Sequence, residues 1–298
     1  MKQILNKLKE PYEKKYKKLL LIPIILLILS ISLLGYSKIT TGEYIEKDVS
    51  LTGGITVTVY TSENIDINSV KTSLESQLNT EVKIRELTSI ANAGTLGYTF
   101  EMQDIASEEE IIDTISSEIN IEITSENSSI EQTSATLGAS FFRSSMTAII
   151  FAFIFMAIVV FFYFRKIVVS GAIILSVIFD VLVTLGIMNI IGIKLSTISI
   201  AALLMIIGYS VDTDILLSSK ILKSKKGTIT ERIYRAMNTG LTMQFTTLVV
   251  FLVMFFLSPA IALKEIAIIL IISIFIDIIS TWIQNAGILR LFLEKKHE

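Results

Sequence analysis

Six long apolar runs constrain this 298-residue chain more than any other feature of its sequence. A helix needs about 20 apolar residues to cross the hydrocarbon core of a bilayer. The runs that approach this length cover approximately 19–36, 146–164, 167–190, 195–217, 241–257 and 261–287. Hydrophobic residues make up 52% of the chain, which is more than a soluble domain usually holds. We therefore expect an α-helical membrane protein with six transmembrane helices.

Lys and Arg are distributed unevenly among the segments between these runs. The basic segments are the leader 1–18, residues 165–166, the loop 218–240 and the tail 291–298 with the adjoining Arg290. The short loops opposite hold only Lys194 and Lys264. Because cytoplasmic loops carry the excess of Lys and Arg, we expect a multi-pass protein of the cell membrane with both termini in the cytoplasm. Residues 37–145 then form a large domain outside, and residues 146–290 form a bundle of five helices.

The first run could also be a secretory signal peptide. The apolar stretch of a signal peptide is shorter, however, and a small-residue cleavage site follows it. Gly35-Tyr36-Ser37-Lys38 is a poor site of this kind. We expect residues 19–36 to be an uncleaved first transmembrane helix. The basic loop between 220 and 235 includes apolar residues at intervals, which predicts an amphipathic helix on the inner membrane surface.

The outer segment has the pattern of a small α+β domain with an acidic, solvated surface. Ile55, Val57 and Val59 alternate with Thr, as in a half-buried strand, and Val70, Leu74 and Leu78 follow at helical spacing. Later strands are predicted at Val82–Ile84, at Leu96–Met102 and from Ile121 with Ile123. The sequence Ser107-Glu108-Glu109-Glu110 is a capping box that opens a second helix. The order β-α-β-β-α-β predicts a ferredoxin-like domain.

Several short motifs follow one another on this topology and together carry a family resemblance. They are Asp48 with Gly53-Gly54 after the first run, Thr136-Leu137-Gly138 before the second, Gly208-Tyr209-Ser210-Val211-Asp212 in the fourth, and Asn238 with Thr246-Thr247 in the fifth. In this order they resemble the motifs of the SecD/SecF family, in particular its SecF branch. The resemblance covers the whole chain from the leader onward, including the six runs and the single large outer domain.

The resemblance implies a role in protein export. Members of this family are related to proton-driven exporters of the RND superfamily, and it implies that this chain is one six-helix half of a larger bundle. The implied partners are a SecD homologue in a heterodimer, the Sec translocation channel, the translocating polypeptide and membrane lipid, with coupling to the proton motive force. One alternative is a half-size RND-type exporter of small molecules or lipids that works as a homodimer. Another is a sensor or adhesin, which would need few acids inside the membrane.

The chain departs from the bacterial SecF pattern in two places. Bacterial members tend to have Asn-Asp-Thr where this chain has Asp212-Thr213-Asp214. The fifth helix of bacterial members also carries an arginine, whereas Thr239 to Thr247 contain no base. If that arginine is needed for proton coupling, coupling here is altered, absent or supplied by the partner. Both departures resemble the archaeal branch of the family.

Four aspartates lie inside the apolar runs and are candidates for a proton or ion relay: Asp212, Asp214, Asp180 and Asp277. A charged side chain at this depth costs about 2.5 to 3.5 kcal/mol on the insertion scale, so it normally has a partner or a function. Asp212 and Asp214 are two residues apart, about 200° around a helix, and cannot share one face. The alternative is a structural role, with each acid held by hydroxyls of neighbouring helices. Gln244 and Asn238 are predicted to form hydrogen bonds between helices.

The sequence argues against several other functions. The chain has no Cys, and its single His is His297 in the tail, so we expect no metal site. Neither a G-x-x-x-x-G-K-[ST] run nor a G-x-G-x-x-G run occurs, so we expect no nucleotide cofactor. No pair of nucleophile and base stands out, and we expect no enzyme activity and no catalytic residues. The positive charge of the cytoplasmic loops follows from topology, and we expect no nucleic-acid partner.

Overall fold

The computed structural model describes residues 15–88, 95–102, 107–224, 227–258 and 260–297. Most of the predicted leader therefore lies outside the described residues. The chain divides into two compact units. The helical unit comprises Met1–Glu46, Thr147–Lys194 and Ile198–Glu298, and the α+β unit comprises Lys47–Met146 with Leu195–Thr197.

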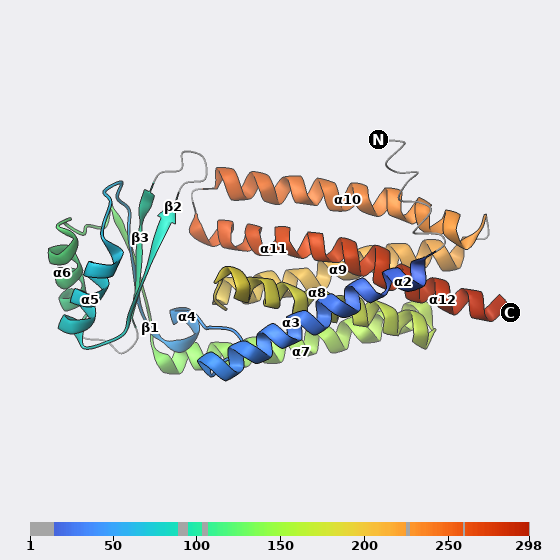
Figure 1. Cartoon of the computed structure of the whole chain (residues 1–298), viewed down its shortest axis with the longest axis horizontal. Coiled ribbons are helices and arrows are strands. Elements are labelled where there is room, and N and C mark those ends of the chain that lie inside the picture. The colour runs from blue at the N-terminus through green and yellow to red at the C-terminus, as the bar shows by residue number, and fades with distance from the viewer. Residues whose placement is uncertain (1–14, 89–94, 103–106, 225–226, 259, 298) are drawn as a thin grey trace. The chain divides into compact units, whose positions relative to one another are not determined.

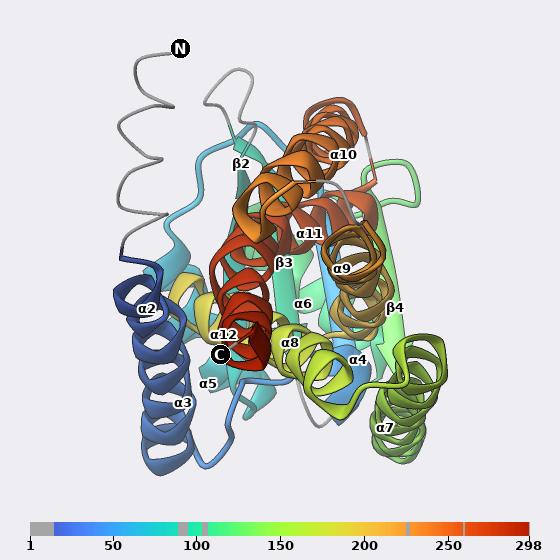
Figure 2. The same cartoon turned by 90° about the vertical axis from the view of Figure 1, so that its right-hand side faces the viewer.

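Six helices of the described chain are long and apolar enough to cross a membrane, which confirms the predicted number (Figure 1). The helices are α2 (Tyr16–Leu19) followed by α3 (Leu21–Thr41), α7 (Ala135–Phe164), α8 (Ile167–Ile191), α9 (Thr197–Lys223), α10 (Ile229–Leu257), and a continuous helix made of α11 (Ile261–Ile279), η1 (Ser280–Asn285) and α12 (Ala286–His297). Figure 2 looks nearly along these helices, of which α8, α9 and the helix that begins with α11 are the most buried. The chain is thus a multi-pass membrane protein.

The segment 218–240 differs from its prediction as a loop. Helix α9 continues to Lys223, and α10 begins at Ile229 behind a capping box between Thr228 and Glu231. The described residues of this segment form no separate helix, since they belong to the ends of α9 and α10, and a place at the inner membrane surface stays a prediction. The segment's apolar residues, such as Ile221 and Ile233, are buried in the core that joins the ends of α9 and α10. The amphipathic pattern arises because each of these helix ends packs on one side only.

The α+β unit has the predicted order of elements. It contains β1 (Gly54–Val59), α5 (Ile67–Leu78), β2 (Val82–Thr88), β3 (Thr95–Met102), α6 (Glu108–Ile119) and β4 (Ser128–Thr133), with the short helix α4 (Val49–Thr52) before β1. The strand order is β2-β3-β1-β4 and every pairing is antiparallel. Helices α5 and α6 lie side by side against one face of this sheet (Figure 1). This split βαβ topology confirms the predicted ferredoxin-like fold.

The last strand of the unit lies later than predicted. The sequence placed it from Ile121 onward, whereas β4 begins at Ser128. The Asn127 side chain holds the intervening turn, because its Oδ1 accepts from the Thr124 amide at 2.7 Å and its Nδ2 donates to the Glu122 carbonyl at 2.8 Å. Ile121 still packs against the core of the sheet, which explains why its apolar pattern resembled a strand.

Two adjacent glycines allow the chain to enter β1. Gly53 has φ +86° and Gly54 has φ +136°, a region that favours glycine. A Cβ at Gly53 would overlap the backbone of Ala135 at the start of α7, and a Cβ at Gly54 would overlap the carbonyl of Met102 in β3. Both glycines therefore lie in close contact with neighbouring backbone. Asp48 lies just before, where its amide donates to the Leu195 carbonyl at 2.8 Å.

Replacing Gly54 with Ala should therefore cost more than backbone strain alone. Strain at a positive φ costs about 1 to 3 kcal/mol, and the overlap with Met102 adds to it. Gly42 is the matched control, because it has φ +82° with open space where a Cβ would stand. We expect Gly54→Ala to lower the thermal unfolding midpoint of the full chain in detergent clearly more than Gly42→Ala. Equal effects would contradict the overlap.

Candidate functional site

Three aspartates from three helices meet inside the helical unit. Asp180 of α8, Asp214 of α9 and Asp277 of α11 are all fully buried. Each pair among them is close enough to interact electrostatically. We call these three side chains the carboxyl cluster.

The burial of α9 explains why Asp214 joins this cluster and Asp212 does not. The buried residues of α9 recur at helical spacing and include Leu203, Ile207, Ser210, Asp214 and Leu217. Asp212 lies about 200° from Asp214 around the helix and is exposed on this chain. The two acids therefore occupy different faces, as predicted.

Neutral side chains donate to two members of the cluster. The Ser210 hydroxyl donates to Asp180 Oδ2 at 2.5 Å, and this contact joins α8 to α9. Asn285 Nδ2 donates to Asp214 Oδ1 at 2.7 Å, and this contact joins α9 to the end of η1. The second oxygen of each carboxyl, Asp180 Oδ1 and Asp214 Oδ2, is buried without a donor in hydrogen-bond geometry.

Asp277 has the fullest set of donors. Gln244 Nε2 on α10 donates to Asp277 Oδ2 at 2.7 Å, and the Thr281 hydroxyl donates to Asp277 Oδ1 at 3.1 Å. Trp282 Nε1 in turn donates to Gln244 Oε1 at 2.9 Å. The prediction that Gln244 links helices by hydrogen bonds is confirmed. Gly240 allows this approach, because a Cβ there would overlap the Trp282 ring.

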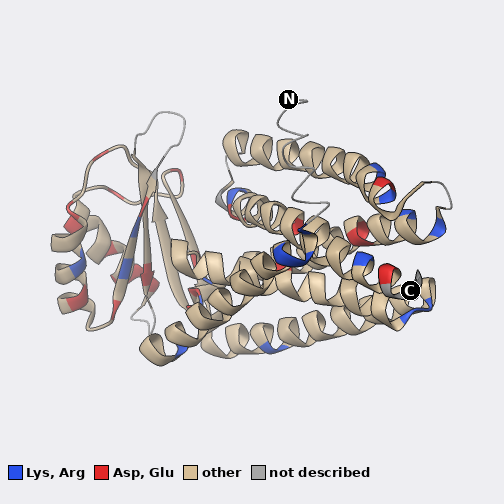
Figure 3. Ribbon diagram, turned by 45° about the vertical axis from the view of Figure 1, so that its right-hand side comes forward, with Lys and Arg blue, Asp and Glu red and all other residues tan. Residues whose placement is uncertain are grey.

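No Lys or Arg of the described residues compensates the charge of the cluster. Among the described residues, the hydrogen-bonding and electrostatic partners of Asp180, Asp214 and Asp277 include neither Lys nor Arg. Figure 3 shows that Lys and Arg in the helical unit lie mostly toward the helix ends. An unpaired ionised carboxylate in an apolar interior is costly, and neighbouring carboxylates repel one another. Three simultaneous negative charges are therefore unfavourable, and the cluster is suited to holding protons.

The sequence reasoning missed Thr281, Trp282 and Asn285. A signal for two of them was present, because Asp277, Thr281 and Asn285 follow one another at intervals of four residues. That spacing places polar side chains along one face of a helix. The π-helix η1, which includes all three missed residues, has no comparable sequence signal.

The remaining predicted residues lie apart from the cluster or at its edge. Gly208 and Asn238 are exposed on this chain, and the hydroxyls of Thr246 and Thr247 donate to the Met243 carbonyl of their own helix. Tyr209 is half-buried and interacts electrostatically with Asp277. Asp48, Gly53 and Gly54 belong to the α+β unit. In the part of the chain that the structure describes, no three His, Asp or Glu side chains are arranged to hold a metal ion.

Gly186 allows close approach between two helices. A Cβ there would overlap Ser30 of α3, whose hydroxyl donates to the Leu182 carbonyl at 2.6 Å. A Cβ placed at Gly171 or Gly208 would have no described residue within 4 Å other than the backbone of its own helix. Both positions are therefore open within the described chain.

The chain is similar to curated proteins and to a solved structure. It is 41% identical over 285 residues to the protein-export membrane protein SecF of Methanocaldococcus jannaschii, which covers 94% of this chain and 96% of that protein. It is 32% identical over 293 residues to SecF of Pyrococcus furiosus, which covers 98% of this chain and 96% of that protein. Both organisms are archaea, in line with the expected archaeal branch.

The fold is similar to that of SecDF, a translocon-associated membrane protein from Thermus thermophilus. The TM-score is 0.76 at 20% identity, over 94% of this chain. This chain spans only 38% of the length of that SecDF chain. The sequence model of the family described as "Protein export membrane protein SecD/SecF, C-terminal" matches residues 114–295. With more than half of its length matched by this model, and with near full-length SecF relatives above 30% identity, the chain belongs to the SecD/SecF family of protein-export membrane proteins.

Proposed function

We propose that this chain is a non-enzymatic subunit of the Sec protein-export machinery. It acts with a SecD homologue to promote translocation of polypeptides, and its carboxyl cluster takes up and releases protons during the export cycle. The observation that carries the proposal is the set of three buried carboxyls without a cation, found inside a protein whose relatives are protein-export membrane proteins. Ionisable side chains inside a membrane are rare and mark ion paths or proton relays.

The topology of the proposal follows the distribution of Lys and Arg. Both termini lie in the cytoplasm, and the α+β unit lies outside, where it meets the emerging polypeptide near the Sec channel. The helical unit contacts membrane lipid on its remaining faces. Helix α9 begins at the α+β unit and carries Ser210 and Asp214, so a single helix connects the outer unit to the cluster by covalent continuity.

The exposed face of α9 supports the proposal of a partner subunit. Gly208 and Asp212 lie on this face, and a carboxylate at this depth is unfavourable against lipid. A second copy of this chain would bring two Asp212 carboxylates toward one symmetry axis, and like charges repel. A SecD homologue that offers a donor or a cation opposite Asp212 avoids this repulsion. The exposed face therefore favours a heterodimer over the homodimeric exporter.

Replacing Gly208 with Leu tests this interface. The site is open within the chain, so we expect the purified chain alone to unfold at an unchanged temperature. In native membranes the added side chain should obstruct the partner and reduce its co-purification by at least about tenfold, which corresponds to about 1.4 kcal/mol of binding. The measurement is a mild-detergent pull-down of the tagged chain with quantitative mass spectrometry.

Gly171→Leu is the matched control, because it also adds Leu at an open helix position. Recovery of a SecD homologue with the wild-type chain, and its loss in Gly208→Leu alone, supports the proposal. Recovery of a defined homodimer without such a homologue would favour the small-molecule exporter.

A further inference from the structure

A six-residue π-helix interrupts the last membrane span between α11 and α12. π-helices are rare and are frequent at functional sites. From this segment Thr281 donates to Asp277 at 3.1 Å and Asn285 donates to Asp214 at 2.7 Å. One short segment thus holds two members of the carboxyl cluster, which belong to two different helices.

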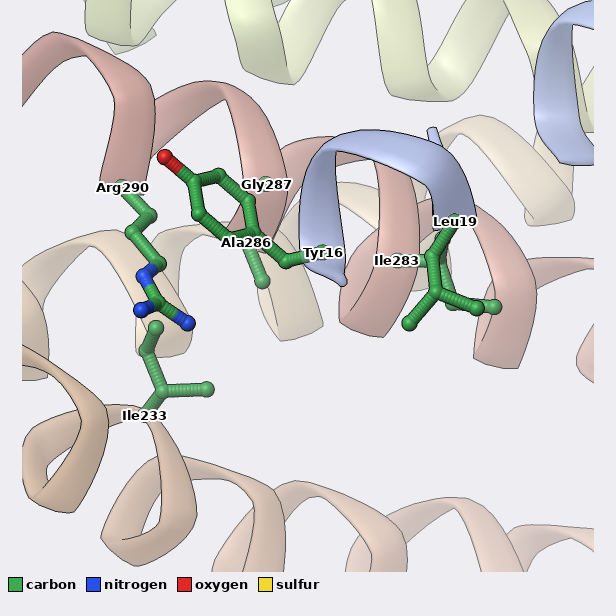
Figure 4. A pocket seen from close by; sticks show the side chains of 7 residues that line it. All are labelled: Tyr16, Leu19, Ile233, Ile283, Ala286, Gly287 and Arg290. Carbon is green, nitrogen blue, oxygen red and sulfur yellow. The ribbon is translucent and has the colours of Figure 1, made fainter. Parts of the chain in front are cut away.

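Beyond the π-helix, α12 docks on the first helices of the chain. The Tyr16 hydroxyl donates to Glu294, and Arg290 lies over the Tyr16 ring at 4.1 Å while its Nε donates to Glu294 at 2.8 Å. Gly287 lies against Leu20, where a Cβ would overlap the Leu20 side chain. We call this set of contacts the α2–α12 latch. A small pocket beside the latch is lined by Tyr16, Leu19, Ile233, Ile283, Ala286, Gly287 and Arg290 (Figure 4).

The π-helix determines which side of α12 faces the latch. A π-turn holds one more residue than an α-turn, and one residue corresponds to a rotation of about 100° around an α-helix. If residues 280–285 became α-helical, α12 would turn by this angle relative to α11. The contacts with Asp277 at one end and with Tyr16 and Leu20 at the other could not then both be kept.

Two polar atoms of the π-helix have no partner among the described residues. Gln284 Nε2 and Asn285 Oδ1 are buried and form no hydrogen bond with this part of the chain. Buried polar groups are normally paired, so an unpaired group calls for an explanation. A second arrangement of the segment, in which these atoms find partners, supplies one.

We propose that η1 is a two-state joint that links the carboxyl cluster to the α2–α12 latch. Asn285 and Thr281 are its positioning residues, and their hydrogen bonds to Asp214 and Asp277 hold the π form. When these bonds weaken, the segment becomes α-helical, α12 turns and the latch opens. During the export cycle, a change of charge in the carboxyl cluster triggers this transition. This part of the inference rests on the proposed function. The titratable groups that face the joint are Asp180, Asp214, Asp277 and Tyr209, and those at the latch are Tyr16, Lys17, Arg290 and Glu294.

The absence of Cys makes the joint accessible to paired spin labels. Lys18→Cys and Leu291→Cys place labels on the two sides of the latch in the full chain in lipid nanodiscs. Pulsed electron paramagnetic resonance should give one main distance for this labelled parent. Asn285→Leu and Asp214→Leu break the same hydrogen bond from opposite sides. Each of these two variants should show a second distance between the labels that differs from the first by about 5 Å or more. The reason is that rotating α12 by about 100° displaces a side chain by at least its distance from the helix axis.

The double variant should show the same second distance as either single variant, because one bond is lost in all three. Asn189→Leu is the matched control, because Asn189 lies nine residues beyond Asp180 on α8, about 13 Å along the helix, and it should keep the parent distance. Thr281→Val is nearly isosteric and removes the hydrogen bond from Thr281 to Asp277. It serves as the test variant if Asn285→Leu does not fold. An unchanged distance in folded Asn285→Leu or, failing that, Thr281→Val would overturn the joint. The distance is measured without export or proton flow, so failure of the proposed function would not alter it.

Discussion

Asp277→Asn should lower export activity by at least about tenfold and leave the stability of the chain nearly unchanged. Proton transfer by a positioned side chain typically contributes 10²- to 10⁴-fold in rate, and an amide cannot take part in it. The amide nevertheless fits the site. Its oxygen accepts from Gln244 Nε2, and its nitrogen donates to the Thr281 hydroxyl, which can turn from donor to acceptor. The measurement is the rate at which a secreted substrate becomes accessible outside cells that contain only the variant.

The control for this prediction is an Asp→Asn change without a buried partner. Asp113 is exposed on α6, so Asp113→Asn should export at the parental rate. Co-purification of the partner and the thermal midpoint are measured for both variants. Normal export by a correctly assembled Asp277→Asn protein would exclude Asp277 from the proton path. A loss of export together with the partner would instead point to an assembly defect.

The fold could be predicted from the sequence where the hydrophobic pattern had one interpretation. Runs of about 20 apolar residues have few uses other than membrane spans, and six of them were found. Alternation at Ile55, Val57 and Val59 gave β1 because one face of the sheet is buried and the other is polar. The pattern failed at Ile121, where a loop residue packs on the core without joining the sheet.

The site was harder to predict because lipid and protein interior are equally apolar. On α9 the exposed Met205 and the buried Ile206 are both apolar, so the sequence does not distinguish the lipid-facing side from the buried side. Asp212 and Asp214 could be assigned to different faces, but not to a particular one. Asn285 was missed because its role depends on η1, whose position follows from contacts between helices.

Gln244→Leu should destabilise the helical unit strongly. Gln244 is only 1% exposed and satisfies two buried groups, the Asp277 carboxyl and the Trp282 indole N–H. Leu has nearly the same size, so little cavity forms, but Asp277 Oδ2 loses the Gln244 donor and the Trp282 indole N–H loses the Gln244 acceptor. A buried polar group without a partner costs about 1 to 3 kcal/mol, and more if it is charged, so we expect a loss of about 3 kcal/mol or more.

Asn238→Leu is the control for Gln244→Leu. It measures how far replacing an amide side chain with Leu on this helix changes the free energy of unfolding when no buried partner is lost. Asn238 lies on the same helix and is exposed, so its replacement should change the free energy of unfolding by less than about 0.5 kcal/mol. The measurement is a denaturant titration of the purified chain in mild detergent. A cost for Gln244→Leu as small as that of Asn238→Leu would mean that Trp282 and Asp277 find other partners. The double variant Gln244→Leu with Trp282→Phe distinguishes the two groups when it is compared with Trp282→Phe alone, because the difference between them leaves the cost at Asp277.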